Sequence, residues 1–275
     1  MSTTREPVRI GIAGFGTVGR EIARRIDQGL LPGARLTAVA ARDLARAGAN
    51  AAELTARPAV VPLAELPDHA DVIVEAATAM AFPEIARVVL TAGKTLIAVS
   101  AGGIPACPDM TELAERHGGR VRIASGALPG LDAIRGAAEG RIHSVRLFSR
   151  LRPDSLVHEE YILAKGFDFT TPPKDRVKVF EGSAREAAAA FPRHFNVAIT
   201  LSLGGIGFDR TMIEVYADPT VPGAIHKVEV ESDDVGLTME SRNRPSATNP
   251  RTSRMVAPSI MAALRSMVAP IQVGS

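Results

Sequence analysis

One histidine lies in a segment whose pattern is that of a β-strand with one inward face. The segment GAIHKVEV, residues 223–230, alternates apolar and polar residues and has Val228 and Val230 on its apolar face. His226 is in phase with these valines, so we expect its ring to point inward. Imidazole titrates near neutral pH and transfers protons. His226 is therefore either a hydrogen-bonded core residue or a general acid–base.

A glycine-rich loop near the N-terminus is the second candidate site. Gly14, Gly16 and Gly19 form the pattern G-x-G-x-x-G, between an apolar strand-like segment and a segment with helical spacing. In dinucleotide-binding folds the first glycine permits a tight turn, the second admits the pyrophosphate and the third lets helix pack on strand. The helix N-terminus, with Thr17 and Val18, then faces the phosphate charge. The loop predicts binding of NAD or NADP.

The choice between these cofactors depends on the end of the second predicted strand. An acidic residue about 20 positions after the glycines binds the ribose 2′-hydroxyl and favours NAD. Here Ala41 is followed by Arg42 and Asp43. A small residue followed by arginine suits a 2′-phosphate, so we predict that NADP is accepted at least as well as NAD. The alternative is that Arg42 is solvated and Asp43 binds the ribose.

The elements that must position these residues predict two α/β domains. Residues 1–125 alternate helix-like segments with nearly continuous apolar runs, which is typical of a doubly wound parallel Rossmann sheet. Residues 126–249 contain strands that alternate apolar and polar positions, which predicts a second α/β domain with a mixed, largely antiparallel sheet. The amphipathic segment in residues 250–275 is expected to be a helix that returns to the first domain.

Composition excludes several classes of function. The 275 residues have a net charge of +2, dispersed arginines and no tryptophan, which argues against a nucleic-acid surface. We expect no signal peptide, membrane segment or metal site. Cys107 is the only cysteine and indicates a reducing cytoplasm. It has no neighbouring histidine, which argues against a thiol mechanism like that of semialdehyde dehydrogenases.

Several motifs resemble those of the L-aspartate dehydrogenase family, in which a Rossmann domain is joined to a small α/β catalytic domain. The resemblance covers nearly the whole chain and is carried by IASGALPGLDAI (123–134), the segment 180–211, ADPTVPGAIH (217–226) and NRPSATNPRTS (243–253). It implies that His226 is the catalytic residue. It also implies that Ala127 and Asn196 contact the cofactor near the nicotinamide.

The implied reaction is the oxidation of L-aspartate at Cα, with hydride passing to NAD or NADP. Iminosuccinate forms first, and water converts it to oxaloacetate and ammonia; the reverse reaction is a reductive amination. The imine can also enter pyridine nucleotide biosynthesis. The expected partners are therefore a small amino or oxo dicarboxylate and ammonia, and the expected assembly is a homodimer without nucleic acid or membrane.

A dicarboxylate substrate needs cationic or hydrogen-bonding groups. Arg150, Arg152 and Arg251 are candidates because guanidinium groups bind carboxylates through two hydrogen bonds, and Ser125 is a candidate through its hydroxyl. Two departures from the family pattern concern the same region. His194 replaces a common asparagine, and Arg152 precedes a proline where the family commonly has lysine.

Two other functions remain open from the sequence. A related dehydrogenase, such as homoserine dehydrogenase, would use an alcohol and would not depend on ammonia. A non-catalytic NADP-sensing Rossmann protein would bind the cofactor without turnover. The histidine at position 226 argues against a sensor, because a sensor needs no proton-transferring residue.

Overall fold

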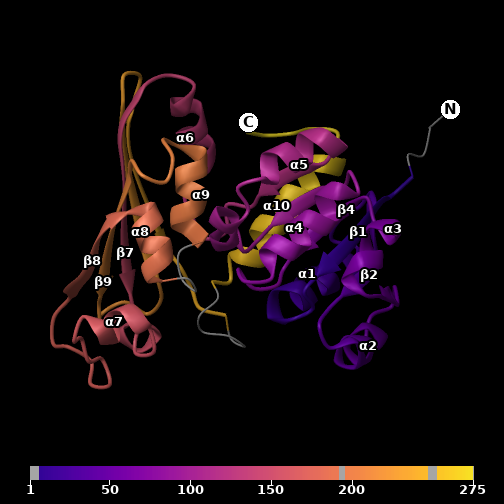
Figure 1. Ribbon diagram of the computed structural model, residues 1–275, viewed down its shortest axis with the longest axis horizontal. Coiled ribbons are helices and arrows are strands. Elements are labelled where there is room, and N and C mark those ends of the chain that lie inside the picture. The colour runs from indigo at the N-terminus through magenta and orange to yellow at the C-terminus, as the bar shows by residue number, and fades with distance from the viewer. Residues whose placement is uncertain (1–5, 192–195, 247–252, 275) are drawn as a thin grey trace. The chain divides into compact units, whose positions relative to one another are not determined.

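The computed structural model divides into two compact units, each of which is described here by itself (Figure 1). The first unit comprises residues 1–124 and 257–273, and the second comprises residues 125–256 and 274–275. Among the residues that the structure describes, no helix is long and apolar enough to cross a membrane. The described residues are 6–191, 196–246 and 253–274.

The first unit contains a six-stranded parallel sheet in the order β3-β2-β1-β4-β5-β6. The chain moves outward from β1 to β3 and then returns to the other side of β1, so the strand order reverses between β1 and β4. In doubly wound sheets, ligands bind at this reversal, beyond the carboxyl ends of the strands. The predicted parallel Rossmann sheet is confirmed. Its strands are β1 (Val8–Ala13), β2 (Ala34–Ala40), β3 (Ala59–Val60), β4 (Val72–Glu75), β5 (Thr95–Ala98) and β6 (Arg120–Ile123).

The helices of the first unit follow from the apolar spacing of their sequences. In α1 (Thr17–Asp27), Ile22 and Ile26 are buried on one stripe of the helix, which agrees with the helical spacing of this segment, whereas Val18 is half-buried. The C-terminal α10 (Val256–Val268) begins at the boundary of the units and packs within the first, where Arg265 donates a hydrogen bond to the Leu30 carbonyl. The others are α2 (Leu44–Ala52), α3 (Leu66–His69), α4 (Phe82–Thr91), α5 (Met110–His117) and the 3₁₀ helices η1 (Leu63–Glu65) and η2 (Ala101–Ala106).

The second unit contains a five-stranded mixed sheet in the order β11-β10-β7-β9-β8. Only the pairing of β7 with β9 is parallel, so the predicted mixed, largely antiparallel sheet is confirmed. Its strands are β7 (Ile142–Leu151), β8 (Val177–Ser183), β9 (Thr211–Ala217), β10 (Ile225–Ser232) and β11 (Gly236–Arg242). Its helices are α6 (Leu131–Ala138), η3 (Pro153–Ser155), α7 (Glu160–Ala164), α8 (Ala184–Ala190) and α9 (Asn196–Gly204).

Helices α6, α8 and α9 lie along one face of this sheet, and the hydrophobic core of the unit is between them and the strands (Figure 1). Side chains on a strand alternate between faces. Val228 and Val230 of β10 are fully buried in this core. His226, in the same phase, is only 6% exposed. The expectation that its ring points inward is therefore confirmed.

Candidate active site

The glycine loop that follows β1 is held tightly against the ends of two neighbouring strands. Gly14 has a φ of +100°, and a Cβ there would lie 2.6 Å from the backbone of Ala76, just after β4. Its amide donates to the Ala40 carbonyl of β2 at 2.8 Å. A Cβ on Gly19 would overlap the Gly14 carbonyl oxygen. The first and third glycines are thus required by the packing of the protein itself.

Gly16 differs from its two neighbours in the motif. A Cβ built on it would meet nothing within 4 Å, so packing within the protein does not require glycine there. Gly16 is the N-terminal cap of α1, whose first turn, fully described, carries no acidic side chain. Thr17 is exposed and Val18 is half-buried in that turn. An open backbone at a helix N-terminus is what a pyrophosphate needs, so these residues fit a dinucleotide.

A buried carboxyl group stabilises the loops beside this site. Glu75, the last residue of β4, is fully buried and accepts hydrogen bonds from the amides of Ala77 and Ser100, both at 2.8 Å, and of Val99 at 3.1 Å. Burial raises the pKa of Glu75, and these amide donors oppose the rise. The sequence analysis missed Glu75, although an acid at the end of the apolar run VIVE was the signal.

At the end of β2, Asp43 and Arg42 have different surroundings. The Asp43 carboxylate caps α2 by accepting a hydrogen bond from the Arg46 amide at 2.9 Å. Arg42 is exposed. The carboxylate is therefore already engaged in a helix cap, while the guanidinium remains open to solvent.

In the second unit, His226 lies in a row of polar side chains across three strands. Its direct neighbours are Ser149 on β7 and Ser241 on β11. The Ser149 hydroxyl, which is fully buried, lies 3.0 Å from His226 Nδ1. Burial lowers the pKa of His226 to about 4, because the protein interior disfavours the charged imidazolium. The ring is therefore neutral at physiological pH and can accept a proton.

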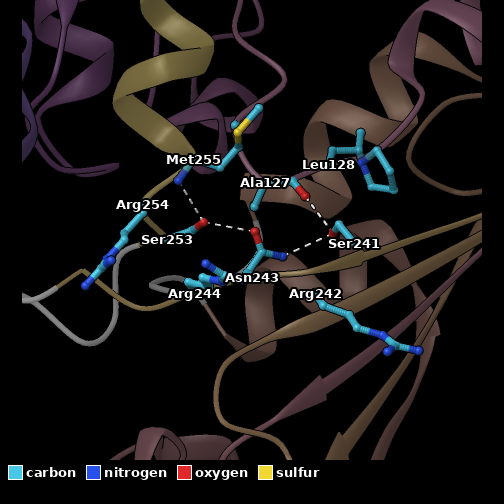
Figure 2. Close-up of a pocket in the computed structure, with 11 residues that line it drawn as sticks. Ala127, Leu128, Ser241, Arg242, Asn243, Arg244, Ser253, Arg254 and Met255 are labelled. Atoms are coloured by element: carbon cyan, nitrogen blue, oxygen red, sulfur yellow. Dashed lines mark hydrogen bonds between the residues drawn. The ribbon is translucent and has the colours of Figure 1, made fainter.

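The row continues as a chain of hydrogen bonds along one wall of a cavity of about 470 Å³ (Figure 2). Ser241 Oγ donates to the Ala127 carbonyl at 2.9 Å, and Asn243 Nδ2 donates to Ser241 Oγ at 3.1 Å. Ser253 Oγ donates to Asn243 Oδ1 at 2.9 Å and accepts from the Met255 amide at 3.1 Å. Ala127, predicted from the resemblance as a cofactor contact, is thus fixed beside His226's neighbour.

Ser125 and Asn196 are two further predicted site residues that lie within the described part of the chain. The carbonyl of Ser125, a predicted substrate contact, accepts a hydrogen bond from the Leu128 amide at 3.0 Å and so closes a turn at the edge of the cavity. Asn196 begins α9 and is exposed.

The structure does not bring the predicted substrate arginines of β7 to His226. Arg150 alternates with Ser149, so it lies on the opposite face of the sheet, where its Nε donates to Asp218 at 2.8 Å. Burial raises the pKa of Asp218, but hydrogen bonds from Thr220 and Arg150 hold it below its usual value. Arg152 is exposed and pairs with Asp154. The alternation of side chains along this strand could have shown from the sequence that Arg150 and Ser149 lie on opposite faces.

Two predicted positions, Arg251 and His194, lie outside the described residues. Within the described ranges, no group of three or more His, Cys, Asp or Glu side chains could hold a metal ion.

Comparison with known proteins identifies the family. Residues 132–267 match the family model described as aspartate dehydrogenase, C-terminal, and residues 14–124 match homoserine dehydrogenase, NAD binding domain. The chain is 42% identical to L-aspartate dehydrogenase 3 of Bordetella bronchiseptica, over 99% of this chain and 100% of that protein. The chain belongs to the L-aspartate dehydrogenase family.

Another member of the L-aspartate dehydrogenase family, from Bradyrhizobium diazoefficiens, is 40% identical over 99% of this chain and 96% of that protein. Two solved structures share the fold. Aspartate dehydrogenase from Thermotoga maritima superposes with a TM-score of 0.73 at 24% identity, over 97% of this chain and 99% of that one. A homoserine dehydrogenase from Thiobacillus denitrificans gives 0.60 at 17% identity, over 96% and 75%.

Membership of the L-aspartate dehydrogenase family confirms the resemblance that the motifs of the second half carried. It also establishes that the protein is an oxidoreductase and that its cofactor is a pyridine nucleotide. The homoserine dehydrogenase family model matches residues 14–124, whereas residues 132–267 match the aspartate dehydrogenase model. The second half of the chain therefore carries the match that is specific to aspartate dehydrogenase.

Proposed function

We propose that the protein is an NAD(P)-dependent L-aspartate dehydrogenase, with the first unit as nucleotide-binding domain and the second as catalytic domain. The reaction gives iminosuccinate, then oxaloacetate and ammonia, and is reversible. One observation carries the assignment of the catalytic group. His226 is a neutral, buried imidazole in a polar row whose next member, Ser241, lines a cavity.

The glycine loop would hold the cofactor by its backbone. Gly16 and the first turn of α1, with Thr17 and Val18, would bind the pyrophosphate, since that backbone is open. The fixed carbonyl of Ala127 and the exposed Asn196 would contact the nicotinamide, as the family resemblance implies. A bound pyridine nucleotide supplies the acceptor for the hydride from Cα.

His226 would manage the protons of the reaction. When Nδ1–H donates to Ser149 Oγ, the lone pair is on Nε2, which makes no hydrogen bond to the described residues. Nε2 can then take a proton from the substrate ammonium group, so that the amine lone pair assists loss of hydride. After releasing that proton to solvent, the same atom can take a proton from the water that attacks the imine carbon. The buried Ser149 hydroxyl would hold the ring in the tautomer that both steps need.

We further propose that NADP is used at least as well as NAD. The Asp43 carboxylate, which would otherwise bind a ribose hydroxyl, caps α2. The exposed Arg42 guanidinium can approach a 2′-phosphate.

The second sheet supports the proposal of a homodimer. The face opposite the helices carries two half-buried aromatic rings, with Arg146 5.0 Å from the centroid of Phe148 and Arg176 4.8 Å from that of Tyr216. A second copy would cover these rings. Sedimentation of the full chain at twice the monomer mass is the expected result, and a monomer at micromolar concentration would contradict it.

We also infer that the protein works in a reducing compartment such as the cytoplasm, because its single cysteine, Cys107, can form no disulfide within the chain. Iminosuccinate that leaves before hydrolysis would supply pyridine nucleotide biosynthesis.

The deciding experiment measures oxidation of NADPH and of NADH, in parallel, with oxaloacetate and ammonium. We expect oxidation that requires both oxaloacetate and ammonium, with kcat/KM for NADPH equal to or above that for NADH. Oxidation without ammonium would indicate an alcohol-forming dehydrogenase instead. Tight binding of both cofactors without turnover on any oxo acid would indicate a sensor. A strong preference for NADH would contradict only the role proposed for Arg42 and would leave the rest of the assignment intact.

A further inference from the structure

The charged residues that line the cavity of the second unit are all arginines. Its volume is about 470 Å³, and three of its lining residues are arginines, Arg242, Arg244 and Arg254. None of the described residues that line it is an aspartate or a glutamate. A site with several guanidinium groups and no carboxylate favours an anionic ligand.

The three arginines are not equivalent. Arg242 Nε donates to the Glu240 carboxylate at 2.7 Å, and Figure 2 shows its side chain directed away from the hydrogen-bonded chain of Ser241 and Asn243. Arg254 Nε donates to the Pro245 carbonyl at 3.1 Å. Arg244 makes neither an ion pair nor a side-chain hydrogen bond to any described residue. Of the three arginines, it is the one whose guanidinium donors are not engaged by any described residue.

The backbone of Arg244 is nevertheless held in place. Its carbonyl accepts a hydrogen bond from the Arg254 amide at 2.9 Å, and the neighbouring residues Pro245 and Ser253 form an antiparallel bridge. On its other side, Asn243 is fixed by hydrogen bonds to Ser241 and Ser253. The cation thus projects from a fixed segment, which lowers the entropy cost of binding an anion.

The cavity is also adjacent to the proposed catalytic base. Ser241 lines the cavity and is the direct cross-strand neighbour of His226 on the same face of the sheet. Side chains that lie opposite each other on neighbouring strands are about 5 Å apart at Cβ. A substrate whose Cα lies beside the His226 ring would therefore place a side-chain group two bonds from that Cα in the cavity.

We propose that this cavity binds the side-chain carboxylate of the dicarboxylate substrate and that Arg244 is the residue that selects it. The proposal rests on the proposed function for the identity of the substrate. Arg244 supplies the charge, and the neutral network of Ser241, Asn243 and Ser253 supplies a wall that adds no repulsion. Two hydrogen bonds from one guanidinium group to a carboxylate give both affinity and a fixed orientation.

The test compares a dicarboxylate with a monocarboxylate in the reductive direction. In Arg244→Gln, kcat/KM for oxaloacetate should fall by roughly 10- to 100-fold, mainly through KM, because a charge-assisted hydrogen-bonded pair is lost. The value for pyruvate, which lacks the second carboxylate, should stay within about twofold of the wild type. The matched control is Arg185→Gln, which removes an exposed guanidinium paired with Asp209 in the same unit; it should leave the oxaloacetate-to-pyruvate ratio unchanged. An unchanged ratio in Arg244→Gln would overturn the proposal.

A binding measurement separates this proposal from the proposed function. Succinate, a dicarboxylate without an amino group, should bind the NADPH-loaded wild type in calorimetry and should bind Arg244→Gln at least about tenfold more weakly. A wild type that binds succinate but does not turn over oxaloacetate, together with a variant that has lost succinate binding, would support the role of the cavity and refute the dehydrogenase assignment. Weaker binding of NADPH itself with unchanged succinate binding would assign the cavity to a cofactor phosphate and overturn the proposal.

Discussion

The candidate site of the first unit is formed mainly by backbone groups, whereas that of the second unit is formed by side chains. In the first unit the site is made of backbone: Gly14 and Gly19 bring the loop against its neighbours, and Gly16 leaves the start of α1 open. In the second unit the site is made of side chains on three strands, with Ser149, His226 and Ser241 in a row. Backbone groups suit a ligand whose phosphates are the same in every turnover, whereas side chains can distinguish one small substrate from another.

The sharpest test of the side-chain site is removal of its base. His226→Gln keeps a hydrogen-bonding group for Ser149 but cannot take up a proton, so kcat for aspartate oxidation should fall by about 10² to 10⁴. Steady-state kinetics with saturating cofactor measure this loss. Affinity for NADPH, which depends on the backbone site, should remain within about twofold; a kcat near the wild-type value would remove His226 from the mechanism.

A second variant tests the hydrogen bond between Ser149 and His226 in the same site. Ser149→Ala removes the partner of Nδ1 but leaves the imidazole, so we expect a loss of roughly tenfold in kcat. Ser149→Thr, which restores a hydroxyl, should recover part of the activity. Equal losses in Ser149→Ala and Ser149→Thr would show that packing, and not the hydrogen bond, sets the ring.

The buried imidazole also predicts how the stability of the protein changes in acid. The pKa of His226 is about 4 in the folded protein and near the ordinary 6.5 in the unfolded chain, so the unfolded chain binds this proton first as the pH falls. Stability present above pH 6.5 is therefore lost progressively towards pH 4. Between pH 7.5 and about pH 4.5, the free energy of unfolding of the wild type should fall by about 2 to 3 kcal/mol more than that of His226→Gln. Urea unfolding at both pH values measures it, and parallel losses in the two proteins would contradict the low pKa.

The backbone site is tested by one pair of glycine substitutions. Gly19→Ala places a methyl group against the Gly14 carbonyl and should lower the free energy of unfolding by about 1 to 3 kcal/mol. Gly16→Ala meets open space, so its stability should change by less than about 1 kcal/mol, while its Kd for NADPH should rise at least about tenfold. Thermal unfolding and fluorescence titration separate the two effects. Unchanged NADPH affinity in Gly16→Ala would mean that the cofactor does not approach that backbone.

The sequence predicted the backbone site better than the side-chain site, and the reason is physical. The glycine loop acts through residues close together in the chain, so the pattern of Gly14, Gly16 and Gly19 contains most of its geometry. The row in the second unit is assembled by strand register, which pairs His226 with Ser149, 77 residues away. The strand phase of His226 could be predicted, whereas the partners on β7 and β11 could not.

The differences between the expected and the observed surroundings of the arginines have the same origin. Arg150 was proposed for the substrate because of its type and its neighbourhood in the chain, but it is one residue out of phase with Ser149 and lies on the other face of the sheet. Arg244 lies within a motif that was used only for its resemblance to the family. That its guanidinium has no partner among the described residues becomes visible only when the pairing of its neighbours is known.

The carboxyl group of Glu75 has a consequence for local motion in the first unit. Its oxygens bind the amide of Ala77 two residues further on and those of Val99 and Ser100, 24 and 25 residues further on. The loops after β4 and β5 are therefore tied to the two oxygen atoms of one buried carboxyl group, Oε1 for Ala77 and Oε2 for Val99 and Ser100. In a hydrogen-exchange experiment these amide protons should be released together, as one cooperative opening unit, although they are far apart in the chain. We therefore expect one side chain to couple the motion of two loops at the edge of the candidate nucleotide site.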